Sequence, residues 1–265
     1  RPAIAFGEIW FCRIISGSDM LAADIESYEI STAKGLFYFA KTVNEDANTY
    51  SGKTVKLTAD IDLKNEPWTP VGQTGATQFK GTFDGQEHTI KNLNIDSSAQ
   101  TGAHYSSGIF GWLNGATVKN INVETATVKG NHNVGVIAGY LETSGCTIDN
   151  CHVTGATLIG KHATSDACGD KVGVIVGHAG NDGVSVKGCT AFSSTVTAER
   201  DAGQIVGAAK EANVIGCTAT MVTVTRIDSP TCTDGNAGQN IRNFGISDVI
   251  ENRFVIFIKQ DNHTL

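Results

Sequence analysis

The chain has 265 residues, of which 40% are hydrophobic and 18% are charged, a balance typical of a globular protein and unlike that of a disordered one. It carries 20 Lys and Arg against 27 Asp and Glu, giving a net charge of −7. An acidic chain without a basic stretch lacks the electrostatic footprint of a nucleic-acid-binding protein. No apolar run approaches the roughly 18 residues that a transmembrane helix needs, so we expect no transmembrane segment.

The first element expected along the chain is an amphipathic helix over residues 31–44, with Ser31 or Thr32 as its N-cap. Its apolar residues recur at helical spacing: Leu36, Phe39, Ala40 and Val43. Because it is rich in aromatic residues, we expect it to close one end of the fold. Residues 1–50 are therefore predicted to form an N-terminal flank and helical cap, with the apolar segment 4–15 packed beneath the helix or paired at the same end.

An alternating segment at 54–63 is typical of a strand, and 64–80 forms an excursion that contains Trp68. Five copies of one short pattern then follow, at 89–93, 117–121, 147–151, 185–189 and 213–217. Their last residues are 28, 30, 38 and 28 positions apart. Glycine-flanked segments keep the same period, at 108–111, 135–139, 173–177 and 203–207. Self-similarity at a period of about 20 to 50 residues indicates a solenoid, a propeller or a repeat array.

Each period holds three short segments rich in Val, Ile and Thr, as at 108–113, 116–123 and 126–129. Helical repeats would need longer amphipathic stretches, and a propeller blade needs four strands in about 40 residues. We therefore predict an all-β fold, a right-handed parallel β-helix over 51–240 with about five coils of 28–38 residues and three short strands per coil. Residues 241–265 are interpreted as a C-terminal flank, either a strand that caps the last coil or a cloning-derived tail.

Two side-chain ladders follow from the repeat. Positions predicted to point inward carry Leu93, Ile121, Cys151, Cys189 and Cys217, so these cysteines are interpreted as small buried hydrophobes. The disulfide state of the seven Cys stays open, because stacked turns about 4.8 Å apart can accommodate a disulfide. A second position carries Asn92, Asn120 and Asn150 and then two glycines, which predicts a corner with positive φ.

The glycine-flanked turns and the T-[IV]-x-N-x pattern that follows them resemble the GLUG-motif repeats of secreted and cell-surface bacterial proteins. The segments 79–90 and 57–63 match what commonly precedes such repeats, so the resemblance covers about 31–225. It implies a β-solenoid in a secreted or surface-exposed bacterial protein, of which this chain is expected to be a part. Similar repeats accompany the catalytic domain in proteins that resemble immunoglobulin-A-cleaving zinc peptidases, but this chain has no H-E-x-x-H zinc site.

Parallel β-helices often host enzymes that act on polysaccharides, so clustered acidic residues are candidate catalytic groups. The candidates here are Asp60, Asp62, Asp84, Glu87 and His88. A glycosidase needs two carboxylates about 5 to 10 Å apart, one of them with a raised pKa. Asp84 and Gly85 fit a turn more simply, so we expect no catalytic constellation.

Binding residues are predicted at aromatic positions and in the insert at 160–171, which lengthens one period; insertions in solenoids fall on one face, often the binding face. The candidates are Trp68, Tyr105, His162, Asp166 and Asp170, and Trp112 fits either a sugar platform or the core. The spacing of the insert matches no standard metal site, so neither a metal nor a cofactor is expected.

The leading hypothesis is a non-enzymatic extracellular or surface module that serves as an adhesin, a ligand-binding platform or a stalk of a larger bacterial protein. Its partner is expected to be a host or microbial glycan or a surface protein. The alternative is a carbohydrate-active β-helix enzyme, a polysaccharide lyase or a glycoside hydrolase. A third hypothesis, a purely structural spacer, predicts no ligand.

Overall fold

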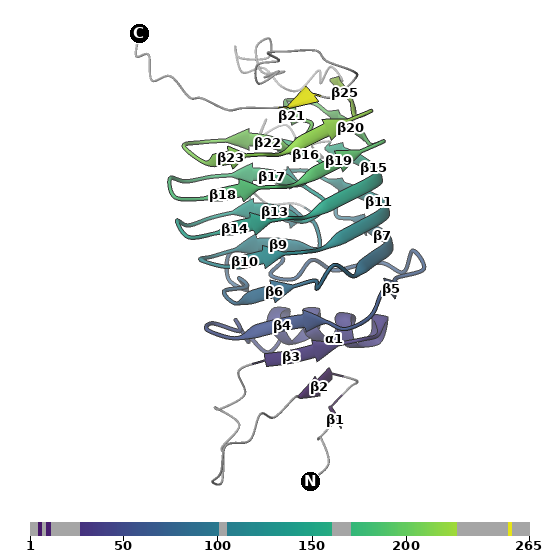
Figure 1. The fold of residues 1–265 in the computed structure, drawn as a ribbon, viewed down its shortest axis with the longest axis vertical. Coiled ribbons are helices and arrows are strands. Elements are labelled where there is room, and N and C mark those ends of the chain that lie inside the picture. Colours follow the sequence, from purple (N-terminus) through teal and green to yellow (C-terminus); the bar gives the residue numbers. More distant parts are fainter. Residues whose placement is uncertain are drawn as a thin grey trace.

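Short segments that alternate apolar and polar residues form parallel strands that stack turn upon turn into a β-solenoid of about six turns (Figure 1). This computed structural model describes residues 27–100, 105–160 and 171–226, and the backbone of 5–6, 9–11 and 254–255. The predicted fold class is confirmed. The coil differs in detail from the prediction, because its strands fall into four sheets, here named A to D, and not three.

Sheet A contains one short strand from each turn, and neighbouring strands pair in parallel. Its parallel strands are β3 (Ser27–Ile30), β4 (Thr54–Leu57), β6 (Thr82–Asp84), β10 (Thr117–Lys119), β14 (Thr147–Asp149), β18 (Ser185–Lys187) and β23 (Asn213–Ile215). The repeated pattern forms β10, β14, β18 and β23, and β3, β4 and β6 precede it. The first predicted copy, at 89–93, lies in sheet B, where Thr89 pairs with Asn122 and not with Thr117, so its predicted alignment with the other copies is wrong.

Sheet B follows sheet A around a corner and contains the longest strands. Its parallel strands are β5 (Ile61–Asp62), β7 (Thr89–Asp96), β11 (Asn122–Gly130), β15 (His152–Gly160), β19 (Thr190–Phe192), β20 (Thr195–Ala198), β24 (Thr218–Thr220) and β25 (Thr223–Arg226). In the last two turns the strand is interrupted by Ser193 and Met221, which both adopt positive φ.

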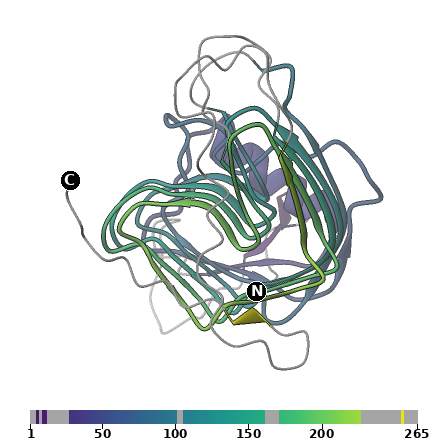
Figure 2. The same ribbon diagram turned by 90° about the horizontal axis from the view of Figure 1, so that it is seen from above.

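Sheets D and C complete the turn and are joined by the glycine-flanked segments. Sheet D contains β8 (Ser106–Ser107), β12 (Asn133–Val134), β16 (Lys171–Gly173) and β21 (Asp201–Gly203). Sheet C contains β9 (Phe110–Leu113), β13 (Ala138–Leu141), β17 (Val176–Ala179) and β22 (Val206–Ala209). Seen along the axis, the turns superpose and each bends inward between these two sheets (Figure 2).

The inward bend explains why the segments between sheets D and C carry glycines and why each turn has a fourth strand. A Cβ on Gly139 would lie 2.7 Å from the backbone nitrogen of Ser107, and one on Gly177 would lie 2.4 Å from that of Val134. Sheet C therefore packs against the sheet D strand of the preceding turn with no side chain between them. The segment predicted as one strand, such as 108–113, is a sharp bend followed by a strand.

The predicted helix is present as α1 (Ala33–Asn44), at the N-terminal end of the solenoid (Figure 1). The Thr32 side chain accepts a hydrogen bond from the Gly35 amide at 3.0 Å and so caps the helix. Leu36, Phe39, Ala40 and Val43 are buried against the core. The helix thus covers apolar residues of the first turns that the end of the solenoid would otherwise expose.

Short antiparallel strands lie at both ends of the stack. At the N-terminal end β1 (Ala5–Phe6) pairs with β2 (Ile9–Phe11), and β2 pairs with β3. At the other end β26 (Phe254–Val255) pairs with β24. Both sheets A and B therefore change from parallel to antiparallel pairing at one end.

Candidate functional site

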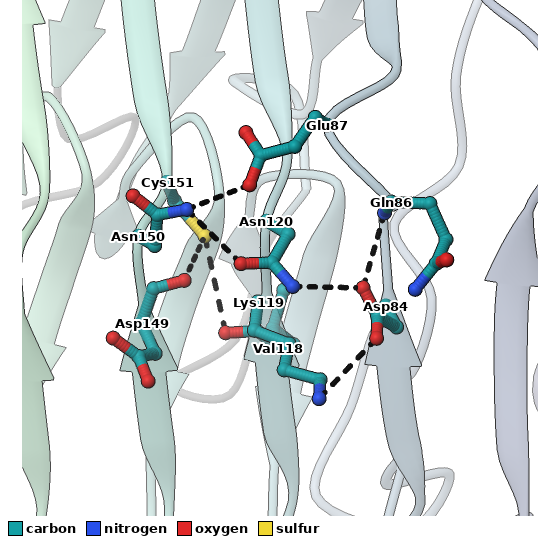
Figure 3. A network of polar contacts seen from close by, with 9 residues as sticks. All are labelled: Asp84, Gln86, Glu87, Val118, Lys119, Asn120, Asp149, Asn150 and Cys151. Carbon is teal, nitrogen blue, oxygen red and sulfur yellow. Dashed lines mark hydrogen bonds and ion pairs between the residues drawn. The ribbon is translucent and has the colours of Figure 1, made fainter.

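The corner between sheets A and B holds a continuous polar network that runs from turn to turn (Figure 3). Asn120 and Asn150 adopt φ of 54° and 52° there, and the equivalent Gly188 and Gly216 adopt 62°. The prediction that Asn92 belongs to the same ladder is wrong, because Asn92 lies within β7 of sheet B, where Lys91 pairs with Glu124 and Leu93 with Ala126. The Asn150 amide donates to the Asn120 side-chain oxygen at 3.0 Å, and the Asn120 amide donates to Asp84 Oδ1 at 3.0 Å. The asparagines thus satisfy the backbone demand of the corner and link neighbouring turns at the same time.

The candidate catalytic carboxylates lie along this corner and accept hydrogen bonds from it. Asp60 Oδ1 accepts a hydrogen bond from the Thr89 amide at 2.9 Å. This bond and a second one with the His88 side chain lower the pKa of Asp60. Asp62 Oδ1 accepts from Asn92 Nδ2 at 2.7 Å, and this bond together with that from the Lys64 amide lowers its pKa. A general acid for glycoside hydrolysis needs a raised pKa, which is the opposite shift.

Asp84 is the most enclosed of these carboxylates, with 6% of its surface exposed. Burial opposes its ionisation, but hydrogen bonds from Asn120 and Gln86 and the Lys119 ammonium, 3.2 Å from Oδ2, outweigh burial and lower its pKa. Asp84 therefore caps a turn and pairs with the next strand, as Figure 3 shows.

The remaining two candidates, Glu87 and His88, also contact neighbouring polar side chains. Glu87 Oε1 accepts from Asn150 Nδ2 at 2.8 Å, and His88 Nδ1 lies 3.2 Å from Asp60 Oδ1. The structure thus brings Asp60, Asp84, Glu87 and His88 to this corner and places Asp62 just beyond it, in β5 of sheet B. The described contacts of all five are with turn backbone and neighbouring side chains.

Asp84 and Asp149 provide a matched test of the network, since each lies 3.2 Å from a lysine on the next strand of sheet A. Asp149 is more exposed and lacks the amide contacts. We expect Asp84→Ala to lower the free energy of unfolding by about 2 kcal/mol, because it removes a buried carboxylate that accepts hydrogen bonds from Asn120 and Gln86, and Asp149→Ala to lower it by less than about 1 kcal/mol. Urea denaturation measures both.

The same pair gives a pH dependence with a definite sign. A lowered pKa means that the folded state favours the ionised carboxylate, so the contribution of Asp84 is complete above the unfolded pKa of about 3.9 and is lost as the pH falls below it. The difference between wild type and Asp84→Ala should therefore shrink below about pH 4. Equal effects of the two substitutions at neutral pH would contradict the assigned role.

The predicted binding residues are dispersed. Trp68 is 4% exposed, its Nε1 donates to the Ile109 carbonyl at 3.2 Å, and its ring packs on Phe37, so its interpretation as a sugar platform is wrong. The side chain is core because the 64–80 excursion folds back over the first turns. Tyr105 is half-buried beside β8. His162, Asp166 and Asp170 lie outside the described residues.

Ile121, Cys151, Cys189 and Cys217 form a ladder in the core, and its three cysteines are free thiols. Leu93 is also buried, but its predicted place in this ladder is wrong, because it pairs with Ala126 in sheet B. The neighbouring Cys151 thiol, together with burial, raises the pKa of Cys189, and Cys189 does the same to Cys217. Since the thiolate is the reactive form, these thiols should be protected. We expect iodoacetamide at pH 8 to modify them only after urea unfolding, with peptide mass spectrometry as the measurement. Modification of Cys189 in the folded protein would contradict this.

Sheet C carries a column of rings that was not predicted from the sequence. Trp112, Tyr140 and His178 are aligned in register, each directly after the last glycine of its repeat, and Ala208 takes the next position. The Trp112 and Tyr140 ring centroids are 4.6 Å apart, and Tyr140 and His178 stack at 5.0 Å with 21° between their planes. In the sequence, each of these residues directly follows a glycine of the repeat. The pattern was not recognised because the residue type differs from turn to turn.

Exposure differs along the column, since Trp112 is buried, with 7% of its surface exposed, whereas Tyr140 and His178 are half-buried. In the pairing of β13 with β17, Ala138, Tyr140 and Leu141 have partners and Gly139 has none. Ala138 and Leu141 are buried in the core, whereas the Tyr140 side chain is half-exposed. Beside it, Glu142 Oε2 accepts hydrogen bonds from Gln78 and from Asn114. This face of sheet C therefore combines stacked rings with side-chain amides and a carboxylate.

Burial, with the nearby Lys171 and Lys210, lowers the pKa of His178 from 6.5 to about 4. The unfolded chain then binds a proton that the folded imidazole does not, so stability should fall as the pH drops from 6.5 to about 4. His178→Phe keeps a ring and should remove that part of the pH dependence. Thermal denaturation at pH 7 and pH 5 tests this, and an unchanged pH dependence in the variant would contradict it.

Comparison with known proteins gives one sequence match. The family model described as the GLUG motif matches residues 130–159. The chain carries a GLUG motif. This confirms the resemblance drawn from the sequence. The matched segment runs from the end of β11 through β12, β13 and β14 into β15, so one GLUG motif corresponds to one turn of the solenoid.

A search of curated proteins finds no match. Among solved structures, the chain is similar to a proposed immunoglobulin A1 protease from Bacteroides ovatus, with 19% identity, coverage of 76% of this chain and 78% of that one, and a TM-score of 0.47. In the part of the chain that the structure describes, no three His, Cys, Asp or Glu side chains form a cluster suited to a metal ion. No helix within that part is long and apolar enough to cross a membrane.

Proposed function

We propose that this chain is a rigid, non-enzymatic β-solenoid module of a secreted or surface-exposed bacterial protein, and that it binds a glycan or a surface protein along one side. The observation that carries the proposal is the use of the corner carboxylates. Asp60, Asp62 and Asp84 accept hydrogen bonds from turn backbone, Asp62 and Asp84 also accept from asparagine side chains, and the pKa of each carboxylate is lowered. These groups are suited to holding turns together and not to protonating a leaving group.

The GLUG turn supports the same proposal. The polar network of the corner and the glycine packing of sheets C and D both join neighbouring turns, so the module is a stiff rod that can carry a binding face away from a cell or from another domain. The face with the strongest features for recognition is that of sheet C, where stacked rings adjoin amide side chains.

The test is to incubate the purified protein on an immobilised glycan array and to measure both retention of the protein and loss of the printed glycan. Retention without loss is the expected result. Loss of a printed glycan would overturn the proposal in favour of a carbohydrate-active enzyme. No retention on any glycan would refute glycan binding. Capture experiments with candidate surface proteins would then test whether the partner is a protein.

A further inference from the structure

The ring column on sheet C ends one turn before the sheet does. Tyr140 covers one face of the His178 imidazole, with 21° between the planes. The opposite face is directed toward the next strand, β22, where the aligned residue is Ala208. A methyl group therefore occupies the position at which the repeat would place another ring.

This position is suited to an external ring. Neighbouring strands are about 4.8 Å apart, which leaves room for one flat group on the imidazole where the side chain above is only a methyl. Ala208 is half-buried, and Lys210, two residues further on, is exposed. Among the described residues β22 is the last strand of sheet C, so no further turn covers the position there.

Positive charge adjoins the same face. The Lys210 amide donates to the Ala179 carbonyl at 2.9 Å, so Lys210 lies beside the residue that follows His178. Lys171 on β16 and Lys210 both act electrostatically on the imidazole. Four other lysines, on sheets A and B, each pair with a carboxylate on a neighbouring strand: Lys91, Lys119, Lys129 and Lys187. Lys210 makes none of the ion pairs found in the described part of the chain. Its closest acidic neighbour in sequence, Glu211, is also exposed.

We propose that the space between His178 and Ala208 binds an acidic sugar residue of a glycan, whose pyranose ring stacks on the imidazole and whose carboxylate pairs with Lys210. The inference rests on the proposed function and names the ligand class and the site. A single carboxylate matches one or two lysines. A polyanion such as a nucleic acid is disfavoured by the net charge of −7.

The probe is the trisaccharide of galacturonic acid, with the neutral trisaccharide of galactose for comparison, each titrated calorimetrically into the wild-type protein. We expect the acidic sugar to bind about tenfold more tightly, the effect of one charge-assisted hydrogen bond. Lys210→Ala should reduce its affinity to that of the neutral sugar. Lys187→Ala, which removes a lysine on sheet A, should leave both affinities unchanged.

Ala208→Tyr tests the space itself, because it completes the column with the protein's own ring. We expect it to weaken both sugars by at least about tenfold while the protein stays folded. In the wild type, the His178 imidazole, followed by NMR, should titrate at higher pH when the acidic sugar is bound, because a carboxylate then lies near it. A variant that fails to fold would be replaced by Ala208→Val, which partly fills the same space.

The outcomes separate this inference from the proposed function. Retention of both wild type and Ala208→Tyr on the same glycans would overturn the site and leave the function standing. Equal binding of acidic and neutral sugars, unaffected by Lys210→Ala, would overturn the acidic-sugar assignment. No binding of either trisaccharide, together with no retention on the array, would overturn the site and glycan binding together.

Discussion

Substitution of Gly177 by alanine is expected to lower the free energy of unfolding by about 3 kcal/mol, because the added methyl group has no space. A Cβ at this position would lie 2.4 Å from the Val134 nitrogen, 2.7 Å from the Gly139 oxygen and 2.8 Å from the Asn133 carbonyl carbon. All three are backbone atoms in or beside strands β12 and β13 of the preceding turn, so none can rotate away. The strands themselves must separate.

Thermal and urea denaturation, followed by circular dichroism, measure the effect, and for a domain of this size we expect a fall in Tm of roughly 6–12 °C. Gly75→Ala is the matched control, because its Cβ would make ordinary contacts of 3.5 to 3.7 Å with the Trp112 ring. We expect that control to change stability by less than about 1 kcal/mol. Equal losses in the two variants would show that close approach of sheets C and D is not the reason for the glycine.

The sequence predicted elements whose signals are local. The cap and the apolar spacing of the helix are contained within 31–44, and α1 begins after the predicted N-cap Thr32 and ends at Asn44 as expected. The repeat period predicted the parallel stacking, and equivalent positions pair in the four copies from 117–121 onward, although not in the copy at 89–93. The positive φ predicted at the corner is likewise observed at Asn120, Asn150, Gly188 and Gly216.

Features that depend on contacts between turns could not be predicted in the same way. The division into sheets D and C depends on how closely Gly139 and Gly177 approach the backbone of preceding turns. The role of Asp84 depends on Lys119 and Asn120, which come from the next turn, 35 and 36 positions later. A carboxylate that caps a turn and one that performs catalysis differ in such partners and not in the residue itself.

Trp68 illustrates the same limit. Its neighbours, Pro67 and Pro70, indicated an irregular and exposed excursion. In the structure, isolated bridges join Pro67 to Asn94 and Val71 to Phe110, so the excursion adds to the edges of sheets B and C. The backbone pairing carries the indole into the interior, although the local sequence is typical of a surface loop.

Phe39→Ala is expected to lower the free energy of unfolding by about 3–5 kcal/mol, because it removes a fully buried ring from the end of the stack. Phe39 lies on α1, and its ring centroid is 5.1 Å from that of Tyr50, 5.7 Å from those of Phe79 and Phe83, and 6.5 Å from that of Phe110. One side chain therefore joins the helix to β6, β9 and the 64–80 excursion.

The distribution of the loss along the rod is as informative as its size. Because each turn contacts mainly its neighbours, removal of the cap should open the N-terminal turns and leave later ones intact. Hydrogen exchange should then show lost protection in β3, β4 and β6 of Phe39→Ala but retained protection in β14 and β18. Phe37→Ala, which removes a half-buried ring 5.2 Å from Trp68, is the control and should cost less than about 2 kcal/mol. Uniform loss of protection in Phe39→Ala would mean that the six turns unfold as a single unit, with the helix holding the entire rod and not only its first turns.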